Sequence, residues 1–210
     1  CSSDLGHWTY TLNNGAANVQ ALAQGETVQE TFTVNVTDDK GAVSAQTVTV
    51  NVTGTNDAPA LSGVATATAQ EDSATTVSGQ LTATDVDHGA TATWSVVDTA
   101  GTYGSLAVDQ TGHWTYTLNN SAANVQALAQ GDTVHDTFTV TVTDDHGASV
   151  SQTVTVDVLG TDDAPVVTSQ IPDERAVEAI PFSLDTASHF ADIDHGDVLT
   201  YSATLANGDP

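Results

Sequence analysis

Cysteine and basic side chains are nearly absent from this chain of 210 residues. Cys1 is the only cysteine, so no disulfide can form within the chain, and stability must come from packing or a bound cation. Lys40 and Arg175 are the only basic side chains beside 27 acidic ones, and the net charge is −25. Nucleic acids and anionic lipids are bound through clustered Lys and Arg, which this polyanion lacks. No apolar run is long enough to span a membrane. The sequence therefore predicts neither nucleic-acid binding nor direct membrane insertion.

Recognisable catalytic motifs are also missing. The chain has no His-Glu-x-x-His, no Gly-x-Ser-x-Gly and no glycine-rich phosphate loop. A general acid and base would need a pocket in which one carboxyl is desolvated, whereas the acids here fall in predicted loops. His88, His146 and His195 each follow acidic residues and precede Gly, which is typical of turns rather than of a zinc site with three or four N or S ligands. We therefore expect a protein that is not an enzyme.

What the chain does contain is a long internal repeat. Residues 6–59 align with residues 112–165, and about four of every five positions are identical. The hexapeptide Gly-Thr-Asn-Asp-Ala-Pro at residues 54–59 returns as Gly-Thr-Asp-Asp-Ala-Pro at residues 160–165. A repeat of about a hundred residues corresponds to one domain. We expect a boundary at each hexapeptide, which divides the chain into residues 1–57, 58–164 and 165–210.

The complete repeat has the pattern of an all-β fold. Alternating apolar and polar residues predict strands over residues 61–69, 75–84, 91–97, 104–109 and 113–118, and two more around Val140 and Val156. Ala122, Val125 and Leu128 instead have helical spacing, which predicts one or two helical turns between sheets. About seven short strands without a long helix predict an Ig-like Greek-key β-sandwich. Trp94 and Trp114 alternate with polar neighbours, so they are interpreted as core residues.

The two ends match only parts of this unit. Residues 1–57 correspond to its second half and residues 165–210 to its first half, so we expect both terminal modules to be incomplete. Cys1 aligns with Ala107 in mid-repeat, which favours a cut in a longer chain over a lipidated terminus. An open sandwich exposes apolar faces and strand edges. As an alternative to simple fragmentation, the C-terminal half-module of one chain could complete the N-terminal half-module of another. The array itself is expected to be monomeric.

Acidic and amide side chains gather in the loops at the two ends of the predicted sandwich. Because the linkers, the loops after the second strand and the tight turns meet at these ends, the side chains of successive modules should meet there. Packing carboxylates without a cation costs about 1 kcal/mol per close pair in water and more at a protein surface. Ca²⁺ takes six to eight oxygen ligands, which two modules and a linker can supply. The candidate ligands are Asn56, Asp57, Glu71, Asp72, Asp85, Asp87, Asp144, Asp145, Asp162, Asp163, Asp192 and Asp194, with Asp132 as a weaker one.

Some of these residues have ordinary structural explanations. Asp144 and Asp145 precede His146 and Gly147 and equally fit a hairpin turn, and acids in the linkers equally fit turns in which a side chain accepts from the backbone. No twelve-residue EF-hand loop follows the Asp-x-Asp pairs.

The middle repeat resembles the VCBS/cadherin-like repeats of large secreted bacterial adhesins of the RTX type. The resemblance rests on Gly-Thr-Tyr-Gly at residues 101–104, Gly-His-Trp-Thr-Tyr at 112–116, Asp-Thr-Phe-Thr-Val at 136–140 and the two linkers. Residues 165–210, with Phe-Ala-Asp-Ile-Asp at 190–194, resemble the start of a dystroglycan-type cadherin-like domain. The resemblance implies Ca²⁺ between modules, held by the linker acids and the Asp-x-Asp loops. Asn56 departs from the acidic linker pattern, which would weaken the first site, and no RTX nonapeptide is present.

We therefore expect calcium-binding, non-catalytic extender or adhesion repeats of a bacterial surface or secreted protein, located outside the cell. Ca²⁺ would stiffen the array, and distal domains would contact cell-surface glycans or another surface. Two alternatives remain: a Ca²⁺-dependent carbohydrate-binding module, which an exposed Tyr103 would favour, and an accessory domain of a large secreted hydrolase.

Overall fold

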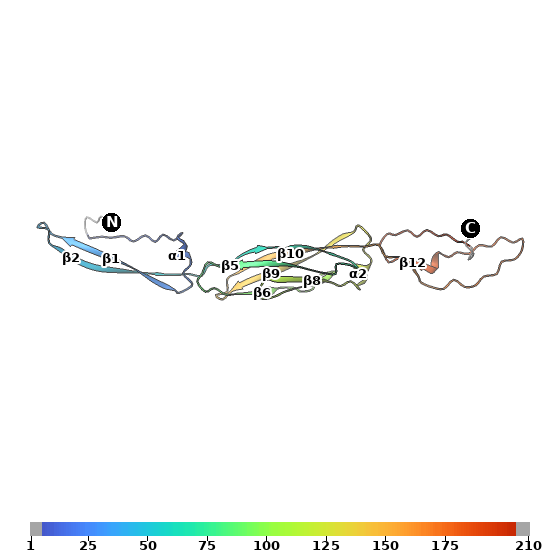
Figure 1. Cartoon of the computed structure of the whole chain (residues 1–210), viewed down its shortest axis with the longest axis horizontal. Coiled ribbons are helices and arrows are strands. Elements are labelled where there is room, and N and C mark those ends of the chain that lie inside the picture. Colours follow the sequence, from blue (N-terminus) through green and yellow to red (C-terminus); the bar gives the residue numbers. More distant parts are fainter. Residues whose placement is uncertain (1–5, 205–210) are drawn as a thin grey trace.

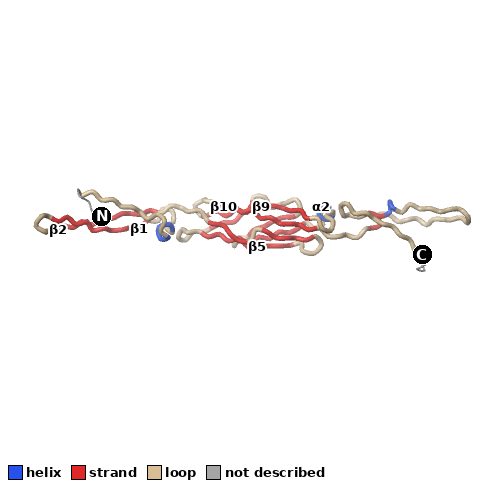
Figure 2. The backbone as a smooth tube through the Cα atoms, turned by 90° about the horizontal axis from the view of Figure 1, so that it is seen from above, coloured by secondary structure: helices blue, strands red, loops and turns tan. Residues whose placement is uncertain are grey.

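The computed structural model describes residues 6–204, so Cys1 and the last six residues lie outside the described part. The chain is drawn out along one axis, with the N-terminus and the C-terminus toward opposite ends (Figure 1). A sandwich of strands lies between an N-terminal hairpin and a C-terminal segment that is mostly loop, as the view from above also shows (Figure 2). Alternating sequences of Thr and Val form strands here because branched side chains suit a pleated surface with one buried face.

The N-terminal segment contains one helical turn and one long hairpin. Its elements are α1 (Ala17–Gln20), β1 (Thr27–Thr37) and β2 (Val43–Thr53). β1 and β2 pair antiparallel from Thr27↔Thr53 to Thr37↔Val43. Trp8, Phe32 and Val34 of this segment are 44%, 42% and 37% exposed.

The central sandwich consists of two four-stranded sheets. Its elements are β3 (Ala60–Gly63), β4 (Thr66–Gln70), β5 (Thr76–Thr84), β6 (Ala92–Val96), β7 (Gly104–Val108), β8 (His113–Leu118), α2 (Ala123–Gln126), β9 (Thr133–Asp144) and β10 (Ser149–Leu159). One sheet has the order β4-β10-β9-β6 and the other β3-β5-β8-β7. The all-β prediction is confirmed.

One predicted strand was wrong in its extent. Residues 61–69 do not form one strand, because β3 pairs antiparallel with β5 in one sheet and β4 pairs parallel with β10 in the other. Gly63 ends the first piece with a φ of +119°, a conformation that L side chains rarely adopt. The alternation of apolar residues continues across the break, so periodicity alone could not reveal the change of sheet.

The core lies between the two sheets of the central sandwich. Trp114 and Tyr116 from β8 are fully buried, and the inward side chains of β9 and β10 face them. The indole of Trp114 donates a hydrogen bond to the carbonyl of Val64 at 2.8 Å, beside the break between β3 and β4. Val125 of α2 is fully buried, which confirms the predicted helical turn.

A buried carboxylate ties the sheet that contains β9 to the loop before β7. Asp136 on β9 is 3% exposed and accepts hydrogen bonds from the backbone N–H groups of Thr102, Tyr103 and Gly104 at 2.7, 3.0 and 3.0 Å. The Tyr116 hydroxyl donates to the same carboxylate at 2.9 Å. Sequence reasoning missed this role, because an acid at an inward strand position is rare and becomes acceptable only when such donors surround it.

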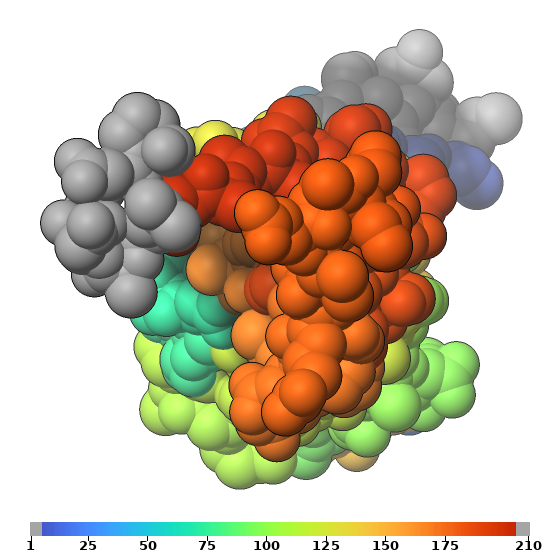
Figure 3. All heavy atoms as spheres, turned by 90° about the vertical axis from the view of Figure 1, so that its right-hand side faces the viewer, coloured from blue at the N-terminus to red at the C-terminus, as the bar shows by residue number. Residues whose placement is uncertain are grey.

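The C-terminal segment forms little regular structure. It contains β11 (Val166–Val167), the 3₁₀ turn η1 (Ala187–His189) and β12 (Phe190–Ala191), and β11 pairs antiparallel with β12. The space-filling view down the long axis shows this segment in orange and red at the near end of the molecule (Figure 3). Phe182 and Tyr201 are 52% and 49% exposed. No helix in residues 6–204 is both long and apolar enough to cross a membrane.

Candidate metal centre

Two acidic junctions lie at the two ends of the central sandwich. The first junction comprises the linker at residues 54–59, the loop at 85–89, the turn at 144–147 and residues 21–26 of the N-terminal segment. The second junction comprises the linker at residues 160–165, the turn at 70–73, the loop at 192–197 and residues 126–132.

The first junction is organised by its Asp-x-Asp loop. Asp85 Oδ1 accepts from the N–H of Asp87 at 3.0 Å, and Asp87 Oδ2 accepts from the N–H of Asp57 in the linker at 2.9 Å. The Asn56 amide donates to Asp144 Oδ2 at 2.9 Å, so the turn at residues 144–147 belongs to this junction. The structure thus brings together the predicted side chains of the linker, the loop and the turn.

Two oxygens of this loop are buried and have no hydrogen-bond partner. They are Asp85 Oδ2 and Asp87 Oδ1, and Asp87 is only 8% exposed. A buried carboxylate oxygen without a partner is costly, because it has lost water and gained nothing in exchange. A cation beside these oxygens would remove that cost.

The second junction repeats the same frame. Asp192 Oδ1 accepts from the N–H of Asp194 at 3.1 Å, and Asp194 Oδ2 accepts from the N–H of Asp163 at 2.8 Å. Asp194 Oδ1 and Asp163 Oδ2 are buried without a partner, and so is Thr161 Oγ1. The equivalent oxygens Asp87 Oδ1 and Asp194 Oδ1 are therefore buried without a partner at both ends of the sandwich.

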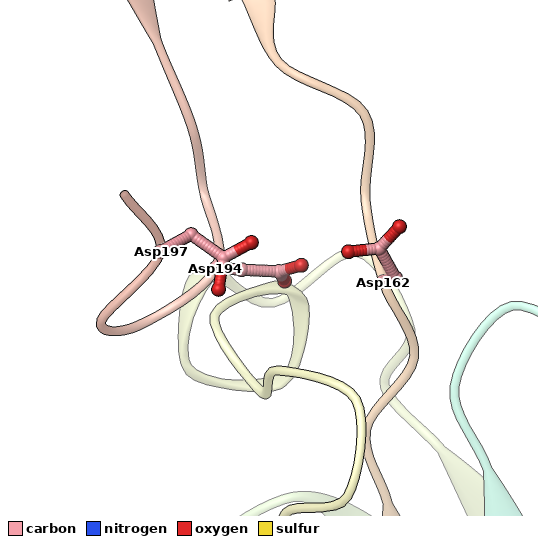
Figure 4. A group of neighbouring side chains, drawn as sticks. All are labelled: Asp162, Asp194 and Asp197. Carbon is pink, nitrogen blue, oxygen red and sulfur yellow. The ribbon is translucent and has the colours of Figure 1, made fainter. Parts of the chain in front are cut away.

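Three carboxylates converge at the second junction. Oxygens of Asp162, Asp194 and Asp197 lie within 4.8 Å of one another. Figure 4 shows the Asp162 side chain on the linker turned toward Asp194, with Asp197 beside Asp194 on the same loop. Asp197 was not among the predicted ligands. Its position three residues after Asp194 is the signal that could have found it, because a tight turn through Gly196 returns the chain to the same site.

Glu71 closes the second junction from the central sandwich. Its side chain is fully buried and accepts from the Gln126 amide at 2.9 Å and from the N–H of Thr161 at 3.3 Å. Burial raises the pKa of the Glu71 carboxyl, and the negative charge of Asp163 adds to the rise. Asp72 next to it has a φ of 56° and accepts from the Asn120 amide at 2.6 Å.

The acids of the two junctions have opposite electrostatic surroundings. Burial raises the pKa of the Asp163 and Asp197 carboxyls, and neighbouring acids raise both further. At the first junction, the hydrogen bond from Asn56 lowers the pKa of Asp144, and the N–H of Ala23 lowers that of Glu26. Burial and neighbouring carboxylates thus raise the pKa of these two acids at the second junction, whereas hydrogen bonds lower the pKa of Asp144 and Glu26 at the first.

Two predicted residues make hydrogen bonds apart from the unpartnered carboxylate oxygens described above. Asp145 accepts from the N–H of Thr91 at 3.4 Å and lies 3.6 Å from the ring of His146. Asp132 accepts from the N–H of Ala129 at 3.2 Å. These contacts match the turn and loop roles that the sequence left open. Tyr103 is partly buried against the core, so it offers no exposed aromatic platform for a sugar.

The oxygen sets fit Ca²⁺ in kind. Carboxylate, amide and backbone oxygens are the ligands of hard cations, whereas zinc prefers N and S donors. Lys40, the one lysine of the chain, pairs with Asp39 away from both junctions, and the ion pairs found among residues 6–204 do not include Arg175. Among residues 6–204, no lysine or arginine side chain therefore pairs with a buried carboxylate of either junction.

Comparisons with known proteins agree with the fold. Residues 56–160 match the family described as bacterial cadherin-like domain. Protocadherin gamma B2 domains 1–5 are similar at 20% identity and a TM-score of 0.43, with 69% of this chain and 28% of that chain covered. Drosophila N-cadherin EC1-4 is similar at 16% identity and a TM-score of 0.44, with 71% of this chain and 37% of that chain covered. Mouse cadherin-23 EC22-24 is similar at 19% identity and a TM-score of 0.46, with 76% of this chain and 49% of that chain covered. The chain thus spans less than half the length of each of these structures. No curated protein matches. With half of its length matched by the family, the chain belongs to the bacterial cadherin-like domains.

Proposed function

We propose that this chain is a calcium-binding, non-catalytic spacer or adhesion segment of a bacterial surface or secreted protein. The proposed modules are residues 1–57, 58–164 and 165–210, with a Ca²⁺ site at each junction. The observation that carries the proposal is the group of buried, unpartnered carboxylate oxygens on Asp85, Asp87, Asp163 and Asp194.

The first site would be held by Asn56, Asp57, Asp85, Asp87 and Asp144. The second would be held by Glu71, Asp162, Asp163, Asp192, Asp194 and Asp197. Bound Ca²⁺ supplies positive charge that joins ligands from the linker and from both flanking modules. The protein contributes the loop frame, in which Asp57 and Asp163 anchor Asp87 and Asp194 through backbone N–H groups.

A stiff array is the expected consequence. With a net charge of −25, successive modules repel one another, and the linkers alone do not set an angle between them. Ca²⁺ outside the cell reaches millimolar levels, which suits modules of modest affinity. The extended arrangement in Figure 1 is the form that such junctions would hold, and it supports a role in projecting distal domains toward glycans or another surface.

Calorimetric titration of the full chain with Ca²⁺ tests the proposal. We expect binding near two equivalents, loss of one class of sites in Asp87→Asn and of the other in Asp194→Asn. Asp157→Asn, an exposed change on β10 whose side chain makes none of the contacts described for either junction, removes the same charge and should leave both classes intact. No heat in the unaltered chain, or equal loss in the Asp157 control, would contradict the proposal.

A further inference from the structure

The two junctions share the backbone frame of the linker and the Asp-x-Asp loop, and within that frame they differ in a few side chains. The N–H of His88 donates to the carbonyl of Ala21 at 3.0 Å, and the N–H of His195 donates to the carbonyl of Ala127 at 3.1 Å. The contacts of Asp57 with Asp87 and of Asp163 with Asp194 also match, at 2.9 and 2.8 Å. A difference in behaviour between the junctions can then come from the substituted positions and from the turns at residues 144–147 and 70–73, each of which belongs to one junction only.

The first junction has direct contacts where the second has negative charge. Asn56 occupies the position of Asp162, and its amide donates to Asp144 at 2.9 Å. Ala90 stands after Gly89, where the second loop has Asp197 after Gly196. Two acidic ligands of the second junction are thus neutral in the first, and one of the neutral replacements makes a hydrogen bond.

A second direct contact joins the two sides of the first junction. Glu26 Oε2 accepts from the N–H of Ala23 at 3.1 Å and also lies 3.1 Å from Nδ1 of His88 in the next module. The corresponding residue of the second junction is Asp132, which accepts from Ala129 in the same way at 3.2 Å. Asp132 is one methylene shorter, and none of the side-chain contacts described for residues 6–204 joins it to His195.

We infer that the two junctions respond differently to Ca²⁺: the second is a calcium-dependent joint, whereas the first is held mainly by direct contacts and keeps its alignment without the ion. This inference rests on the proposed calcium function. Without a cation, the three convergent carboxylates of the second junction repel one another at the point where the modules meet. More carboxylates also favour tighter Ca²⁺ binding, so the second site fills first.

Distance measurements across each junction in the full chain test the inference. With Cys1 replaced by serine, spin labels are placed at Thr33 and Thr117 across the first junction, and at Thr82 and Ser183 across the second; all four sites are exposed. Removing Ca²⁺ with EDTA at pH 7.5 should broaden the distance distribution across the second junction, and saturating Ca²⁺ should narrow it. The first distribution should stay narrow in both conditions, and the second site should bind Ca²⁺ about tenfold more tightly.

Exchange of the distinguishing residues gives matched controls. Asn56→Asp with Ala90→Asp should make the first junction calcium-dependent, and Asp162→Asn with Asp197→Ala should lower the affinity of the second about tenfold or more. Glu26→Asp, which copies the second junction, should broaden the first distribution in EDTA; thermal unfolding checks that each variant folds. Bound Ca²⁺ with equal responses at both junctions would overturn this inference and leave the proposed function standing. No Ca²⁺ binding at either junction would overturn both.

Discussion

The buried carboxylate of Asp136 offers a sharp test of how the central sandwich is held together. Replacement of Asp136 by Ala would leave three backbone N–H groups and the Tyr116 hydroxyl without their acceptor. Hydrogen bonds to a charged group contribute roughly 1.5–3 kcal/mol each, but bonds to one acceptor are not additive. Removal of one member of a buried charged network typically costs about 3–5 kcal/mol, so we expect a loss of that order.

The loss can be measured by denaturant and thermal unfolding of the full chain in saturating Ca²⁺. For a domain of about 100 residues, 1 kcal/mol shifts the midpoint by about 4–8 °C, so Asp136→Ala should lower the transition of the central sandwich by more than 10 °C. Asp136→Asn keeps one acceptor oxygen and the shape of the side chain, and should cost about half as much. The exposed change Asp98→Ala, in the loop after β6, is the control. A loss below about 1 kcal/mol for Asp136→Ala would refute the reasoning, because solvent would then have to satisfy the loop.

Three further changes test other parts of the structure. Burial and Asp136 raise the pKa of Tyr116 above its ordinary 10.0, so the folded state holds this proton more tightly than the unfolded state. The free energy of unfolding should therefore fall as the pH rises past 10. Tyr116→Phe should remove about one proton from that pH dependence, which unfolding between pH 8 and 11 measures. A Cβ at Gly79 would lie 2.5 Å from the Trp114 ring, which is fully buried and donates a hydrogen bond to the carbonyl of Val64. Gly79→Ala should therefore lower the free energy of unfolding by about 1–3 kcal/mol. Gly89 has a positive φ and open space around it, so Gly89→Ala shows the cost of backbone strain without a clash. Ca²⁺ that binds only the folded state should stabilise it by mass action, by about 2.7 kcal/mol of unfolding free energy at a hundred times the Kd. Calorimetric scans with saturating Ca²⁺ and with EDTA should therefore show a higher unfolding midpoint with Ca²⁺. An unchanged midpoint would contradict the calcium sites.

Much of the central sandwich could be predicted from the alternation of apolar and polar residues. Phe138, Val140 and Val142 alternate with Thr, and all three proved to be buried. The helical spacing of Val125 and Leu128 likewise marked the turn that became α2. These local patterns are reliable because one face of a strand or helix must be apolar wherever it covers a core. That the terminal parts are incomplete modules stays a prediction from the register of the repeat.

The candidate sites could be predicted only in part. The linker acids stood out because the hexapeptide recurs, and the Asp-x-Asp loops stood out because of their spacing and their place at the predicted module ends. Asp197 and Asp136 did not, because a single acid carries no pattern by itself. The structure assigned them different environments: Asp197 beside other carboxylates, and Asp136 surrounded by hydrogen-bond donors.

The sequence by itself determined the all-β class, the repeat and the clustering of many acidic residues in particular loops. Those features are properties of neighbouring residues, and strand periodicity expresses them directly. Only the tertiary structure decided that β3 and β4 lie in different sheets, that Glu71 is buried at the second junction, and that Glu26 reaches His88 across the first. Such contacts join residues far apart in the chain, so they depend on how the sheets and linkers pack together, which no local pattern encodes.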